Sequence, residues 1–124
     1  MDKGISLIVI PQPACPAAIV SATHTPSNFL HSAILKNVSQ RPLLGFRVGW
    51  VIRFRSGKPD LRLGAPFNLA TAVEPGGVCP VPPQEVNSDD LEKGAVLTGF
   101  FLAEVYLLGD KPWKADLPRI KAES

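Results

Sequence analysis

The stretch Leu44–Phe54 reads LGFRVGWVIRF and decides the fold class of this chain of 124 residues. Large apolar side chains stand at every second position in it: Leu44, Phe46, Val48, Trp50, Ile52 and Phe54. A period of two is what a strand with one buried face requires. At helical spacing the same residues would scatter around the axis, and a helix would bury Arg47 or Arg53. We therefore predict a strand whose large apolar side chains point together into a space between two layers of extended chain.

A second long strand is expected just before this one, over Asn28–Val38, which is rich in apolar and β-branched residues. The segment ends at Asn37 and Ser39, which favour turns, and Pro42 fixes the entry to the next strand. Because the connection is so short, the sequence predicts that the two long strands form an antiparallel hairpin.

The third long apolar stretch is Ala95–Leu108 (AVLTGFFLAEVYLL). Its β-branched and aromatic residues favour a strand over a helix. The pair Gly109-Asp110 that follows suits a tight turn, because glycine accepts a positive φ without strain. We expect this strand to turn there and to continue into a final strand over Trp113–Ile120.

Weaker strand signals are separated by proline or glycine clusters and stand at Ile5–Ile10, Ala17–Thr23, Leu61–Leu63, Asn68–Val73 and Val78–Val86. Pro80, Pro82 and Pro83 confine the last of these to a sheet edge or a loop, because proline has no N–H to donate. Asn87–Lys93 is expected to make one helical turn. Short strands with turn signals between them, and no alternation with helices, predict a β-sandwich or barrel formed by one domain, residues 1–124.

Two stretches resemble a known class of domain. Leu35–Leu43 (LKNVSQRPL), leading into Gly49–Val51, looks like the second and third strands of immunoglobulin-like domains of uncharacterised bacterial proteins. Glu104–Trp113 is similar to their closing hairpin, although Gly109-Asp110 stands where such turns more often have Asp-Gly. The resemblance implies an all-β fold, an immunoglobulin-like antiparallel β-sandwich of seven to eight strands. It implies no catalytic residues.

The composition is that of an ordinary globular protein, with 45% hydrophobic and 19% charged residues, and its 13 prolines argue against a helical bundle. A formal net charge of +2 is too small to indicate nucleic acid or an anionic membrane as partner. No segment approaches the ~20 apolar residues that span a bilayer. The apolar run Ile5–Ile10 is shorter than a secretory signal needs, so we expect a soluble chain, with the cytoplasm as its default compartment.

The residue types that most often carry chemistry are sparse. Cys15 and Cys79 allow one disulfide or two separate buried thiols, and we favour the thiols. His24 and His31 lie seven positions apart, which places them on opposite faces if one strand runs through both, and neither has further ligand residues nearby. We therefore predict no metal and no cofactor. No complete set of catalytic roles can be assembled, so an enzyme is not expected.

A basic face is predicted on the solvent side of the strand that opens this section. Arg47, Arg53 and Arg55 lie there, with Lys58 and Arg62 just beyond. Such a face suits an anionic ligand, a glycan or an acidic partner, or it is simply a solvated surface. The aromatic residues of the strand point the other way, which argues against the stacking platforms that bind nucleic acid.

An apolar face is predicted on the strand Ala95–Leu108. If Phe101, Ala103, Val105 and Leu107 face the core, then the residues that point outward are Phe100, Leu102, Tyr106 and Leu108. Large exposed apolar patches mark contacts with another subunit. The alternative is that the N-terminal segment or the proline-rich residues 75–83 cover this face. We predict a non-enzymatic protein-interaction or structural module, with a homodimer as the obvious form of the contact, and the alternative function is binding of an anionic ligand or glycan through the basic face.

Overall fold

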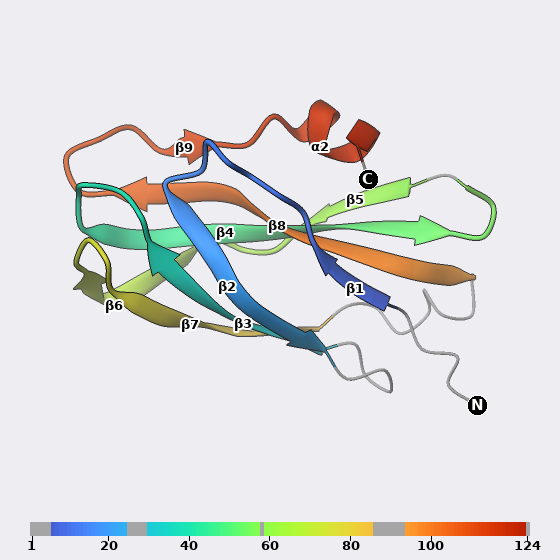
Figure 1. The fold of residues 1–124 in the computed structure, drawn as a ribbon, viewed down its shortest axis with the longest axis horizontal. Coiled ribbons are helices and arrows are strands. Elements are labelled where there is room, and N and C mark those ends of the chain that lie inside the picture. Colours follow the sequence, from blue (N-terminus) through green and yellow to red (C-terminus); the bar gives the residue numbers. More distant parts are fainter. Residues whose placement is uncertain (1–5, 25–29, 58, 86–93, 124) are drawn as a thin grey trace.

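The computed structural model describes residues 6–24, 30–57, 59–85 and 94–123 of the chain. Within these ranges nine strands form two sheets, and one short helix, α2 (Leu117–Glu123), follows the last strand (Figure 1). The prediction of an all-β fold is confirmed. The predicted helical turn at Asn87–Lys93 lies outside the described residues.

The first sheet contains the two longest strands at its centre. Its members are β1 (Ser6–Val9), β4 (Leu43–Phe54), β5 (Pro59–Leu63), β6 (Phe67–Val73), β8 (Ala95–Leu107) and β9 (Trp113–Lys114). The order is β1-β8-β4-β5, while β6 also pairs with β4 and β9 with β8. All these pairs are antiparallel except β1 with β8, which is parallel. The prediction of a purely antiparallel sandwich is therefore wrong for β1.

The second sheet has the order β2-β3-β7 and is antiparallel throughout. Its strands are β2 (Ala17–His24), β3 (Leu30–Asn37) and β7 (Val78–Glu85). The predicted position of the proline-rich strand is confirmed, because β7 lies at the edge of this sheet. Pro80 lies opposite Ile34, and the ladder with β3 shifts in register at Pro82 and Pro83, as is usual for prolines at the edge of a sheet.

The predicted hairpin between the second long stretch and β4 is wrong. β3 and β4 belong to different sheets, so the chain between Asn37 and Leu43 crosses from one layer to the other. The reason lies in the side chains, since Leu35 of β3 and Phe46 of β4 are both buried in the core that the two sheets share. Two strands that face each other across a core cannot also be neighbours in one sheet.

The predicted final strand over Trp113–Ile120 is also shorter than expected. β9 ends at Lys114, and the backbone N–H of Ala115 makes one more bond to the carbonyl of Ala103, 2.9 Å away. The chain then turns into α2, whose first turn is closed by hydrogen bonds to Asp116. The helix forms because Leu117 and Ile120 pack against the outer side of the first sheet.

The alternation along β4 agrees with the sequence except at its start. Phe46, Val48, Trp50 and Ile52 are buried between the sheets, as predicted. Leu44, however, is 36% exposed, because the pairing with both neighbours shifts between Leu43 and Gly45. This β-bulge turns Leu43 into the core in place of Leu44.

A second, smaller apolar cluster lies on the other side of the first sheet. Its buried members are Ile10, Val51, Phe101, Ala103 and Ile120. Leu61, Leu63 and Leu117 pack around them. The middle of β4 and of β8 is therefore buried on both faces, which is why these two segments are the most apolar of the chain.

The crossing between the sheets is held by one fully buried polar residue, Asn37. Its side-chain Nδ2 donates to the carbonyls of Arg41 and Val73, each 2.8 Å away. Its Oδ1 accepts from the backbone N–H and the hydroxyl of Ser39, at 3.0 and 2.7 Å. The main chain of Asn37 is bonded to Gly76 and Gly77 in the turn between β6 and β7. One residue thus joins β3, the crossing, β6 and the following turn.

Replacing Asn37 by alanine should lower the free energy of unfolding by about 3 kcal/mol, because it removes four side-chain hydrogen bonds, including those to the carbonyl of Val73 and the N–H of Ser39. Asn37→Asp is nearly isosteric but lacks the two N–H donors, so at neutral pH it should cost a similar amount. The measurement is urea unfolding followed by circular dichroism. Ser39→Ala serves as the control and should cost only about 1 kcal/mol. A loss below about 0.5 kcal/mol in both Asn37 variants would contradict this role.

Candidate functional site

The predicted interaction face of β8 is largely inside the molecule. Phe100 and Leu102 are fully buried in the core between the sheets, Tyr106 is half-buried, and Leu108 is 54% exposed. The expected outward orientation is therefore wrong for Phe100 and Leu102. These four residues do not form one exposed apolar patch.

A β-bulge at Ala103 explains the error. The pairing of β8 with β4 shifts there, so β8 contains one extra residue. Before the bulge Phe100 and Leu102 face the core between the sheets, and after it Val105 and Leu107 do. An extra residue exchanges the two faces of a strand. A strict period of two therefore placed half of the predicted core-facing residues and half of the predicted outward-facing residues on the wrong side.

Both sides of β8 are covered by other parts of the same chain, which was the alternative considered from the sequence. On one side Phe100 packs in the same core as Cys79 of β7, within the proline-rich segment. On the other side Phe101 packs with Ile10, which follows β1, and with Ile120 of α2. The apolar character of this strand therefore reflects burial within the chain.

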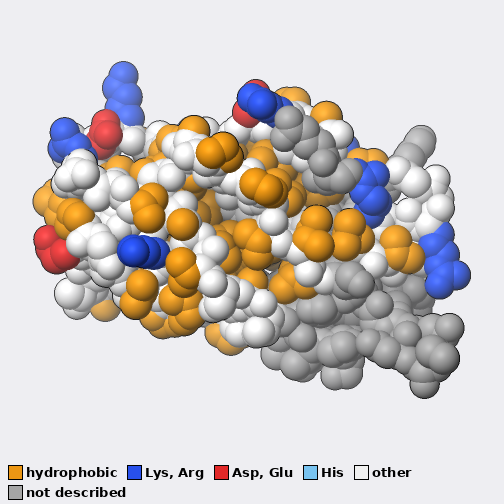
Figure 2. Space-filling model, viewed as in Figure 1, with side chains coloured by type: hydrophobic (Ala, Val, Ile, Leu, Met, Phe, Trp, Pro, Cys, Tyr) orange, Lys and Arg blue, Asp and Glu red, His pale blue; other side chains and the backbone are white. Residues whose placement is uncertain are grey.

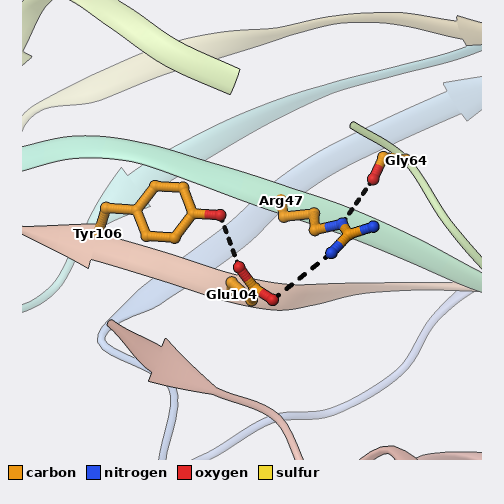
Figure 3. A network of polar contacts seen from close by, with 4 residues as sticks. All are labelled: Arg47, Gly64, Glu104 and Tyr106. Atoms are coloured by element: carbon orange, nitrogen blue, oxygen red, sulfur yellow. Dashed lines mark hydrogen bonds and ion pairs between the residues drawn. The ribbon is translucent and has the colours of Figure 1, made fainter. Parts of the chain in front are cut away.

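A polar network lies on the outer side of the first sheet and joins residues from the two predicted faces (Figure 3). The hydroxyl of Tyr106 donates to Oε1 of Glu104, 2.6 Å away. The other carboxylate oxygen lies 3.6 Å from Nη1 of Arg47, and Nε of Arg47 donates to the carbonyl of Gly64 at 2.6 Å. Arg47 is thus held by β8 and by the chain after β5.

The phenol of Tyr106 is a weak acid in this network. Burial, the hydrogen bond to Glu104 and the negative charge of that carboxylate together raise the pKa of Tyr106 from 10.0 to about 12, against a smaller opposing effect of Arg47. At neutral pH the hydroxyl is therefore protonated and acts as a hydrogen-bond donor. These groups position one another across the sheet surface.

The predicted basic face is less uniform than the sequence suggests. Arg47 is engaged as described, Arg53 is half-buried, and Arg55 is exposed beyond the end of β4. Arg47 and Arg53 lie on the same side of the strand, but six residues apart, which corresponds to roughly 20 Å. Arg62, on the neighbouring β5, pairs with Asp60 at 2.9 Å. The cations do not converge on one point.

The cysteines are two separate thiols, as favoured from the sequence, and both are free and buried. Burial raises the pKa of Cys15 to about 11, with a smaller opposing effect of a backbone hydrogen bond from Ala17, and burial also raises the pKa of Cys79. Both are protonated at neutral pH, so neither has the thiolate that a nucleophile needs.

The two histidines lie on adjacent strands, with His24 of β2 directly opposite His31 of β3. The expectation of opposite faces assumed one strand through both histidines, so it does not apply to residues of two different strands. Among the described residues, no three His, Cys, Asp or Glu side chains come together as a candidate metal site.

An open groove with a volume of about 320 Å³ lies between the connection that joins β1 to β2 and the segment around β9 and α2. We call it the Trp113 groove, and it is lined by Pro11, Gln12, Pro13, Ala14, Cys15, Trp113, Lys114, Ala115, Asp116, Arg119 and Ile120. In Figure 1 the connection from β1 runs up to β9 before it descends into β2. The sequence reasoning missed this groove, because its walls come from opposite ends of the chain.

The outer face of the second sheet, turned away from the core, is the other surface that the sequence reasoning missed. Its described apolar residues are Ala18, Val20, Ile34, Val78, Pro80 and Pro82, of which Val20 and Val78 are 53% and 59% exposed. Figure 2 shows hydrophobic side chains across the middle of the molecule and charged ones mostly near its outline. The alternation in β7 could have indicated this face, because Cys79 and Val81 are buried and the apolar residues between and beside them point outward.

Comparisons of the chain with protein-family models, with curated proteins and with solved structures found no match. Among the described residues, no helix has the length and apolar character needed to cross a membrane.

The chain has one tyrosine, so the ionisation of Tyr106 can be followed directly by the ultraviolet absorbance of tyrosinate. We expect a midpoint near pH 12 in the folded protein, compared with 10.0 for the free group. Because the folded state holds this proton more tightly, the stabilisation is complete below pH 10.0 and is lost as the pH rises toward about 12.

Glu104→Gln is the matched variant for this titration, because it keeps the shape of residue 104 and removes its charge. We expect the midpoint to fall toward that of free tyrosine. Arg53→Gln, on the same strand as Arg47 but outside the network, should leave the midpoint in place. If Glu104→Gln did not move the midpoint, the contact in Figure 3 would not control this hydroxyl.

Proposed function

We propose that the protein is a non-enzymatic interaction module that associates with a second copy of itself through the outer face of its second sheet. The observation that carries this proposal is the exposure of Val20 and Val78 on a face whose described side chains include a single charged residue, Lys36. An open sheet face in a monomer is normally polar, with apolar and polar residues alternating along each strand. Contiguous exposed apolar surface is typical of contacts between subunits.

The pairing within the second sheet sets Pro80 beside Ile34 and separates Val78 from Ala18 by Lys36. Val78 lies opposite Lys36, and Pro80 lies opposite Ile34, so both rows cross from β7 to β3. Ala18 of β2 continues the first row on the other side of Lys36. Lys36 therefore lies in the middle of the first row and Ser21 at the β2 end of the second, while the other side chains of the two rows are small or branched and suit the stacking of one sheet on another.

The edges of the second sheet make it a poor site for adding a strand from another molecule. Two copies are therefore expected to associate through their sheet faces. Pro80, Pro82 and Pro83 deprive that edge of N–H donors, so an added strand there would find an incomplete ladder. At the other edge, β2 has a bulge at Val20, where its register with β3 shifts. Bulges interrupt the regular row of groups that a new strand would need.

The proposal includes the immunoglobulin-like topology for the two sheets. In such domains one sheet holds the strands named A, B, E and D and the other holds C, F and G. The order β2-β3-β7 is compatible with A, B and E, and β8 lies between β4 and β9 as F lies between C and G. The departures are β6, which pairs with β4, and the parallel strand β1.

The alternative function, binding of an anionic ligand through the basic face, has less support. Arg47 is occupied by Glu104 and Gly64, and it lies far along the strand from Arg53. A compact anion would therefore contact at most part of the predicted set. Self-association through the second sheet depends on no such convergence.

The test is the molar mass by light scattering at several protein concentrations. We expect the wild type to show a dimer whose proportion rises with concentration, and Val78→Asp to be a monomer, because the substitution places a charge in the apolar contact. Leu108→Asp is the matched control, since Leu108 has a similar exposed fraction, 54%, on another surface. A wild type that remains monomeric at high concentration, or equal effects of the two substitutions, would overturn the proposal.

A further inference from the structure

The Trp113 groove is a separate surface from the outer face of the second sheet and has the properties of a preformed ligand site. Its volume of about 320 Å³ lies at the lower end of the range usual for small-molecule pockets. It is bounded by two segments that are far apart in the sequence, the connection after β1 and the segment from β9 to α2.

The first wall is fixed by an amide that imitates a peptide group. Nε2 of Gln12 donates to the carbonyl of Leu102, and Oε1 accepts from the N–H of the same residue, both at 2.8 Å. The carbonyl of Gln12 also accepts from the N–H of Cys15 at 3.0 Å. Because Pro11 and Pro13 flank this residue and restrict their own φ angles, the wall has little freedom to collapse into the groove.

The second wall is anchored on the same strand, β8. Trp113 pairs with Val105, and the N–H of Ala115 donates to the carbonyl of Ala103 at 2.9 Å. The N–H of Ile120 donates to the carbonyl of Asp116, also at 2.9 Å. Both walls therefore rest on one central strand, so that the space between them is part of the folded structure.

The lining combines apolar surface with charged groups. Trp113 is half-buried, and Pro11, Pro13 and Ala14 are exposed, so flat apolar surface faces the groove. Such surfaces bind the body of a small planar molecule, and tryptophan supplies a large contact area at low entropic cost. The apolar part of the lining alone would accept many molecules.

The charges decide which molecules the groove prefers. Lys114 and Arg119 line it together with one acidic residue, Asp116. The carboxylate of Asp116 accepts the backbone N–H of Arg119, 3.2 Å away, as part of the start of α2. The lining therefore carries one more positive than negative charge, which favours an anionic group beside the apolar surface.

We propose that the Trp113 groove binds a small organic carboxylate with a flat apolar body. The body packs against Trp113 and the prolines of the first wall, and the carboxylate lies beside Lys114 and Arg119. This ligand class uses both the apolar surface and the excess of positive charge. The site does not depend on self-association through the second sheet.

The experiment uses naphthalene-2-carboxylate and its neutral amide, naphthalene-2-carboxamide, which share one flat body and differ in charge. Binding is followed by the NMR signals of the indole N–H groups, because the chain has two tryptophans and Trp113→Phe assigns them. We expect the carboxylate to shift the Trp113 signal saturably and to leave Trp50, which is buried in the core, unchanged. The amide should bind about tenfold more weakly.

Two variants separate the charge from the shape of the groove. Lys114→Gln combined with Arg119→Gln should weaken the carboxylate about tenfold and abolish the preference over the amide. Ala14→Phe should fill the groove and abolish binding of both probes, while an unchanged Trp50 signal shows that the fold is intact. Ala14 is exposed, so the larger side chain need not disturb the core.

Three results would overturn this assignment: no saturable shift of Trp113 at millimolar probe, equal affinities for carboxylate and amide, or binding that persists in Ala14→Phe. The Val78→Asp variant distinguishes this inference from the proposed function. If that variant is a monomer and still binds the carboxylate, the two surfaces act independently. If it no longer binds although the Trp50 signal is unchanged, the groove is not an autonomous site and the assignment fails.

Discussion

The side-chain amide of Asn37 is the constraint on which the arrangement of the two sheets depends. It is fully buried, and both its N–H groups and both acceptor positions of its oxygen are used. The bonds reach the crossing between the sheets and the end of β6, while the main chain reaches the next turn. An apolar residue there would remove all four of these side-chain bonds, so the geometry of the crossing depends on an asparagine at position 37.

β4 and β8 form the rigid centre around which the candidate surfaces are placed. Their middle portions are covered on both sides, by the second sheet and by the cluster around Phe101 and Ile120. On the outer side, glycines of β4 lie opposite aromatic residues of β8: Gly45 pairs with Tyr106 and Gly49 with Phe101. A side chain at Gly49 would collide with the ring of Phe101. The two glycines of β4, Gly45 and Gly49, thus leave room for the rings of Tyr106 and Phe101.

Local patterns predicted most strands correctly, but not how the strands combine. The alternation from Phe46 to Ile52 was sufficient to place β4, and the prolines of β7 to place it at an edge. The bulges at Leu44 and Ala103 could not be foreseen, because each inserts a residue without changing the composition of the strand. The Trp113 groove could not be foreseen either, since its walls meet only through β8.

The pairing of Gln12 with Leu102 has a consequence for the behaviour of the chain in concentrated solution. β1 occupies one part of the open side of β8 and β9 another, and the Gln12 amide fills the interval between them. Without that amide, the N–H and the carbonyl of Leu102 would lose their partners in the gap between β1 and β9. Unpaired main-chain groups at a sheet edge are where another strand can add, so this one side chain completes the protection of the edge of β8.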